Sequence, residues 1–138
     1  METHYQLTDE TFEAQFRERT LNPQLFANHE AHLRLAWIHI KKYGIEQACK
    51  NLCTQIQAFD ATFGDGTKFH HTLTVASARV VYHFMQKSKA SSFQELITKF
   101  PRLKTNFKDL LDQHYQTNIF ASETAKAHYL EPDLLPFD

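Results

Sequence analysis

The scarcity of residues that interrupt helices is the feature that most constrains how this chain can fold. Its 138 residues include only three glycines and four prolines. These two residue types supply most tight turns, which strands joined by hairpins require. Apolar residues recur instead at helical spacing along most of the chain. We therefore expect an all-α fold, a helical bundle of about five to seven helices without a sheet.

Apolar stripes and capping residues predict where the helices lie. The clearest stripe covers residues 45–63, between Gly44 and the turn Gly64-Asp65-Gly66. Other helices are expected over residues 9–19, from 23 or 28 to 43, from 70–72 to 86, from the caps Ser91 and Ser92 to 100, over 103–114 and over 122–129. The last residues, 131–138, combine two prolines with three large apolar side chains, so we expect an extended tail packed on the bundle.

Length and composition predict one domain, residues 1–138. It would comprise an N-terminal helix and linker (1–25), a bundle core (26–130) and the tail (131–138). The chain is 42% hydrophobic and 22% charged, which argues against disorder. Its net charge of −1 argues against a nucleic-acid partner. An aromatic share of 13% permits a homodimer, although no heptad seam identifies one.

The cellular location is predicted from what the sequence lacks. No apolar run approaches the ~20 residues of a membrane span, and the first ten residues do not resemble a secretory signal. We therefore expect a cytoplasmic protein without a membrane partner. Cys49 and Cys53 lie four residues apart, where a disulfide within one helix would be strained, so we expect two buried, reduced thiols.

Histidine is unusually abundant, with nine residues, and two of them are placed for a site. His29 and His32 are three residues apart, which puts both imidazoles on one helix face. They extend the stripe of Leu33 and Ala36, so we expect both rings to face the core. The spacing differs from the four-residue spacing of the zincin motif.

A third imidazole is available at His70 or His71, after the glycine turn. If the helices alternate in direction, the second and fourth are parallel, and these histidines would share one end of the bundle with His29 and His32. Three imidazoles with an open position are typical of a catalytic metal site. Thr72 and Thr74 would orient a ring or a ligand, and Arg79 and His83, deeper in the bundle, would contact an anionic group.

Three interpretations of these histidines stay open: a bound metal, a metal-free polar pocket, and unrelated structural roles. Imidazole ligands suit zinc, iron, copper or nickel, and ligand type alone does not distinguish them. We expect the other histidines discussed, His4, His39, His114 and His128, to be surface or packing residues. Glu10 and Glu13 could supply a carboxylate that completes a metal site.

Three motifs resemble those of a family of small, uncharacterised bacterial helical proteins. The first is Phe26 with His29-x-x-His32-Leu33-x-Leu35-Ala36-Trp37, and the second is Phe69-His70-x-Thr72-Leu73-Thr74. The third is Ser122-x-x-Ala125 followed by Glu131-Pro132-Asp133 and Pro136. The resemblance covers roughly residues 26–136 and implies that His29, His32 and His70 are the family's histidines, with His71 in a variable slot. It implies no activity.

Two functions follow from these patterns. The first is a small helical protein with a histidine-rich metal or small-ligand site. If the site holds zinc, the metal could activate a water molecule for hydrolysis, and the protein would be a metalloenzyme. The second is a non-enzymatic module that binds a small molecule or a protein without metal. Metal content distinguishes them.

Overall fold

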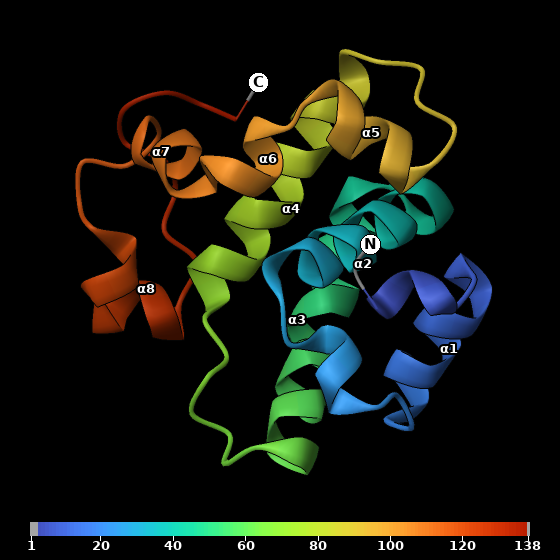
Figure 1. Cartoon of the computed structure of the whole chain (residues 1–138). Coiled ribbons are helices and arrows are strands. Elements are labelled where there is room, and N and C mark those ends of the chain that lie inside the picture. Colours follow the sequence, from blue (N-terminus) through green and yellow to red (C-terminus); the bar gives the residue numbers. More distant parts are fainter. Residues whose placement is uncertain (1–2, 138) are drawn as a thin grey trace. The chain divides into compact units, whose positions relative to one another are not determined.

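The computed structural model describes residues 3–137. All regular secondary structure within this range is helical, with eight α-helices and three short 3₁₀ helices (Figure 1). The expected all-α fold is therefore confirmed. The chain divides into two compact units, residues 1–69 and 70–138. The prediction of a single domain stays a prediction.

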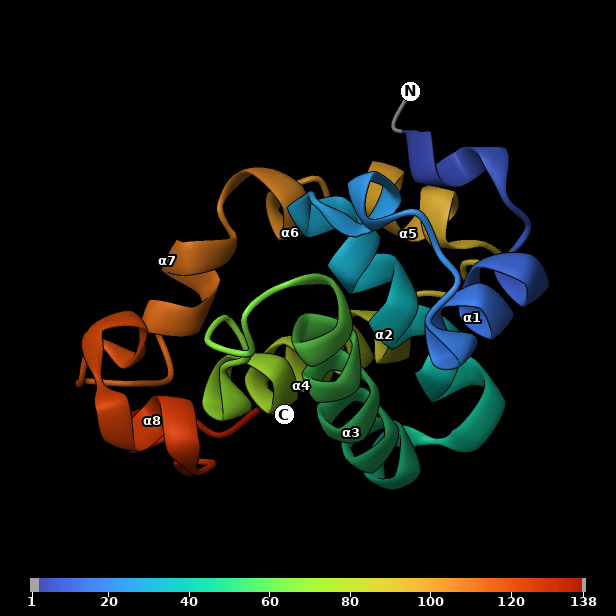
Figure 2. The ribbon, with the colours of Figure 1, turned by 90° about the horizontal axis from the view of Figure 1, so that it is seen from below.

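The first unit is built around two long helices. Its elements are η1 (Thr3–Gln6), α1 (Asp9–Glu18), η2 (Pro23–Phe26), α2 (His29–Tyr43) and α3 (Ile45–Phe63). Helix α2 packs on α3, and α1 contacts both (Figures 1 and 2). Gly44 has φ +85°, a left-handed value that favours glycine, and it joins the two long helices without a loop. Phe16 stacks on Phe59 with ring centroids 4.6 Å apart, inside the core of this unit.

The second unit is organised around one long helix. Its elements are α4 (His71–Gln86), α5 (Phe93–Lys99), α6 (Arg102–Thr105), α7 (Phe107–Asp112), η3 (Ile119–Ala121) and α8 (Glu123–Ala127). Helix α4 contacts α7, η3 and α8. Ser92 caps α5 by accepting a hydrogen bond from the Glu95 amide, and Ser122 caps α8 in the same way from Ala125.

Two expected helices of this unit differ in the structure. The helix expected over residues 103–114 is divided into α6 and α7, because Asn106 leaves the helical region with φ −131° and ψ 34°. The helix expected over residues 122–129 ends at Ala127, because the next residues are extended and bind the side chain of Thr72. The first difference arises from local backbone geometry and the second from long-range hydrogen bonds to Thr72, and apolar spacing encodes neither.

The C-terminal segment is extended and packed, as predicted. The Tyr115 hydroxyl donates to the carbonyl of Leu130 at 2.8 Å, and the Gln116 amide donates to Asp133 at 2.9 Å. Phe137 is buried, with its ring centroid 4.3 Å from that of His114. Leu134 and Leu135 are exposed, so one of the three large apolar side chains anchors the tail.

Both cysteines are free thiols, as expected. Cys49 is buried, whereas Cys53 is half-buried on α3. Burial, with a smaller contribution from Cys49, raises the pKa of Cys53 to about 11. The thiolate, which is the reactive form, is therefore disfavoured at Cys53.

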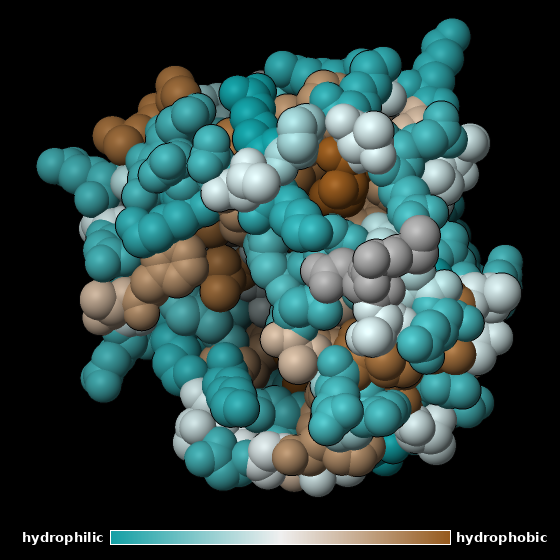
Figure 3. All heavy atoms as spheres, in the orientation of Figure 1, coloured by the Kyte–Doolittle hydropathy of each residue, from teal (hydrophilic) through white to brown (hydrophobic). Residues whose placement is uncertain are grey.

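Hydrophilic residues cover most of the surface visible in Figure 3. No helix within residues 3–137 is long and apolar enough to cross a membrane.

Candidate functional site

His29 and His32 lie in the first turns of α2, and both are exposed. The expectation that they face the core is wrong. The buried residues at this end of the helix are Glu30, Ala31 and Arg34, which lie on a different side of α2. Every residue from Leu33 to Ile40 is buried, whereas His29 and His32 are exposed, so the buried apolar stripe does not extend back to the two histidines.

The ring of His32 is held in one orientation. Its Nε2 lies 2.9 Å from the carbonyl oxygen of Phe26 and must donate a proton to it. The ring also stacks on that of Phe26, with centroids 3.9 Å apart and an interplanar angle of 11°. The residue is exposed as a whole, but the protein around its ring desolvates the imidazole, and this lowers the pKa of His32. The bond to Phe26 acts in the opposite direction, and the nearby charge of His29 lowers the pKa further. His32 is therefore neutral near pH 7, with its lone pair on Nδ1.

His70 uses both ring nitrogens in hydrogen bonds. It is the N-cap of α4, and its Nδ1 accepts from the amide of Leu73 at 3.0 Å. Its Nε2 lies 2.8 Å from the carbonyl oxygen of Ile119, to which it donates. A metal ligand needs a free lone pair on one nitrogen. His70 could bind a metal only after giving up the cap of α4 or the bond to Ile119.

Thr72 and Thr74 also bind backbone groups. The buried hydroxyl of Thr72 donates to the carbonyl of His128 at 2.8 Å and accepts from the amide of Leu130 at 3.0 Å. The hydroxyl of Thr74 donates to the carbonyl of His70 one turn earlier. The structure thus brings His70, Thr72 and Thr74 together, where they fix the start of α4 and hold the segment after α8.

The remaining candidate residues lie elsewhere along α4. His71 is the first residue of the helix and is half-buried. Arg79 is half-buried two turns later, and His83 packs edge-on against Phe84, with ring centroids 5.4 Å apart. Among residues 3–137, no three or more histidine, cysteine, aspartate or glutamate side chains are grouped to hold a metal ion. The meeting of His70 with His29 and His32, which belong to the other unit, stays a prediction.

A buried cation that the sequence patterns did not reveal organises the start of the chain. The side chain of Arg34 is 4% exposed and pairs with Asp9 at 2.8 Å. It also donates to the backbone carbonyls of His4 and Leu7 at 2.6 and 2.8 Å. Its guanidinium lies over the ring of Phe12, 4.8 Å from the centroid. An arginine inside the apolar run of residues 31–40 was the signal that could have revealed this cluster.

A second buried group lies at the other end of α2. Glu13 is 3% exposed and pairs with Arg17 and with Lys42. His39 is fully buried nearby, and its Nδ1 lies 3.4 Å from the amide nitrogen of Asn51. No described residue forms a hydrogen bond with its Nε2. Burial lowers the pKa of His39 to about 4, with Glu13 acting in the opposite direction.

Family models, curated proteins and solved structures yield no match to this chain. The motif resemblance to a bacterial family therefore stays an expectation.

Proposed function

We propose that this chain is a binding protein that holds a divalent transition-metal ion through the imidazoles of His29 and His32. The carrying observation is the hydrogen bond from His32 Nε2 to the carbonyl of Phe26. Histidines that bind metals usually donate their other ring N–H to a carbonyl or carboxylate, which fixes the tautomer and the ring. His32 has that arrangement before any metal binds.

Two further features support this pair. The residues are three apart on α2, so their side chains leave the same face of the helix. Both are exposed, so an ion and its remaining water ligands have access. We leave His70 out of the proposed ligand set, because its two nitrogens are already hydrogen-bonded.

The test is calorimetric titration of the untagged full chain with Zn²⁺, Cu²⁺ and Ni²⁺. We expect one site in the wild type and a loss of affinity of roughly tenfold or more in His29→Ala and in His32→Ala. Affinity should fall as the pH decreases, because protons compete with the metal for imidazole. His128→Ala is the matched control, since His128 is exposed in the other unit, and should bind as the wild type does.

The result for His70→Ala separates the two ligand sets. Unchanged affinity agrees with a two-histidine site, whereas a loss equal to that of His32→Ala would support the three-histidine site predicted from the sequence. Equal affinity of the wild type and the double variant His29→Ala/His32→Ala would refute metal binding at this face.

A metal-free site for a small anion is the second candidate. The pair lies in the first turns of α2, where the partial positive charge of the helix end opposes a cation and favours an anion. Titration with inorganic phosphate distinguishes the two. Saturable phosphate binding that both alanine variants lose, together with no metal binding, would favour the anion site.

A further inference from the structure

Positive charge is concentrated in one stretch of the second unit. Residues 79–108 contain seven lysines and arginines and a single acid, Glu95. Six of the seven acids of residues 70–138 follow residue 108. The net charge of −1 therefore conceals a strongly basic segment, and this segregation is absent from whole-chain composition.

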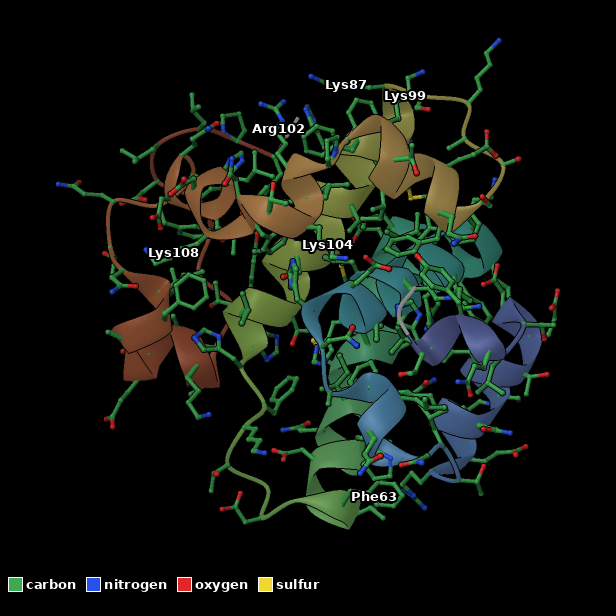
Figure 4. All side chains as sticks on the ribbon, viewed as in Figure 1. Phe63, Lys87, Lys99, Arg102, Lys104 and Lys108 are labelled. Carbon is green, nitrogen blue, oxygen red and sulfur yellow. The ribbon has the colours of Figure 1, made fainter. Side chains whose placement is uncertain are left out.

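The fold gathers these charges at the ends of three helices. Lys87 caps the C-terminus of α4, Lys99 ends α5, and Arg102 begins α6. Lys87 Nζ and the Arg102 guanidinium lie 5.9 and 5.3 Å from the centroid of the same ring, that of Phe84. Figure 4 shows Lys87, Lys99 and Arg102 at one end of the unit, with their charged groups pointing outward.

We define the basic face as Lys87, Lys99 and Arg102, which are all exposed. Lys104 and Lys108 are also exposed, but Figure 4 shows them away from this end of the unit. Lys108 pairs with Asp112 at 2.9 Å, and its Nζ lies 5.6 Å from the ring centroid of Phe120. Lys87 and Arg102 both lie against the ring of Phe84. An anion bound near both would reduce the repulsion between their charges.

A polar pocket adjoins the basic face. It lies between the loop that follows α4 and helix α5, and Lys89 and Lys99 are among its lining residues. Ser92 and Thr98 supply hydroxyl groups to the same lining. Ammonium and hydroxyl donors are the groups that proteins use to contact phosphate oxygens. The carboxylate of Glu95 belongs to the same lining and opposes an anion. The exposed cations of the basic face, rather than the pocket, are therefore the better contacts for a phosphate group.

We propose that the basic face binds the phosphate backbone of a nucleic acid strand. An anionic membrane is the other surface that attracts lysines, but membrane-binding faces add large exposed apolar residues that insert. Between residues 84 and 108 no large apolar side chain is exposed. The exposed ring of Phe120 lies beside Lys108, outside the face. The face itself is thus charged without an apolar anchor, which fits contact with a phosphate backbone without base contacts.

The experiment measures binding of the full chain to a fluorescent single-stranded oligonucleotide of about 16 nucleotides. If Lys87, Lys99 and Arg102 each neutralise one phosphate, log K falls with log salt with a slope of about −2. The double variant Lys87→Glu/Lys99→Glu should bind at least tenfold more weakly. The control Lys50→Glu/Lys68→Glu makes the same change in net charge at exposed lysines of the first unit and should change affinity less than threefold.

Lys87→Gln/Lys99→Gln, which removes charge without reversing it, should show a smaller loss in the same direction. Circular dichroism verifies that each variant is folded. Three outcomes would overturn the proposal: no saturable binding at about 50 mM salt, equal losses in the test and control pairs, or tighter binding to phosphatidylserine vesicles than to the oligonucleotide. Because the metal-site variants lie on α2, failure of either proposal leaves the other intact.

Discussion

A neutral imidazole has one donor and one acceptor nitrogen, and their partners decide what each histidine can do. In His70, both ring nitrogens form hydrogen bonds with backbone groups of its own unit. In His32, Nε2 donates to the carbonyl of Phe26, and Nδ1 is the acceptor nitrogen. Residue spacing could identify the candidates but could not distinguish these cases, because the carbonyl of Ile119 is 49 residues from His70 in the chain.

At the residue scale, Arg34 provides the sharpest stability test. Arg34→Met keeps the apolar stem but removes the donors to His4, Leu7 and Asp9. We expect the free energy of unfolding to fall by roughly 2–4 kcal/mol, since the bonds to buried carbonyls are lost. Urea denaturation measures the change. In Arg17→Met the free energy of unfolding should fall by less than about 1 kcal/mol. The side chain of Arg17 is exposed, and Glu13 still forms its ion pair with Lys42. Equal losses in the two variants would contradict the role of Arg34.

Among the helices, apolar spacing predicted most of the boundaries. The helix expected over residues 45–63 is α3 (Ile45–Phe63), and Asn28 begins α2 through its cap. Spacing failed where one residue redirects the backbone, as Asn106 does between α6 and α7. It also predicted wrongly that His29 and His32 face the core, because the apolar stripe of Leu33 and Ala36 does not extend back to the first turn of α2.

At the element scale, Thr72 joins α4 to the segment that follows α8. Thr72→Val preserves the shape but leaves the carbonyl of His128 and the amide of Leu130 without this partner. We expect a loss of roughly 1–3 kcal/mol and faster proteolysis after Tyr129 and Leu130. Thr74→Val is the control, because its hydroxyl makes a bond within α4. Limited proteolysis with mass spectrometry measures both, and equal cleavage rates would count against the role of Thr72.

Over the whole molecule, long-range pairing limits what one sequence can predict. The all-α class follows from periodicity, which is local. The buried cluster around Arg34 joins residues 25–30 positions apart. Charged patches such as the basic face depend on which helix ends lie close together. The net charge of the whole chain does not reveal them, because acidic residues elsewhere offset their charge. Local spacing therefore predicts helices, whereas the grouping of site residues from distant elements stays a prediction.

Acid stability tests the whole molecule through His39. This ring is fully buried beside Glu13, Arg17 and Lys42, and burial lowers its pKa from 6.5 to about 4. Between these two pH values His39 is protonated in the unfolded chain but neutral in the folded chain. The free energy of unfolding therefore falls as the pH decreases from 6.5 to 4. A shift of this size corresponds to roughly 3 kcal/mol at the acid end.

The comparison that isolates this effect is urea unfolding of the wild type and His39→Gln at several pH values from 7.5 to 4.5. Glutamine does not titrate, so the variant should lose less stability than the wild type over this range, whatever its stability at pH 7.5. Subtracting the two curves cancels the contribution of other groups, including His32. His128→Gln, at an exposed position, should follow the wild type. Parallel curves for the wild type and His39→Gln would show that His39 can be protonated without cost in the folded protein.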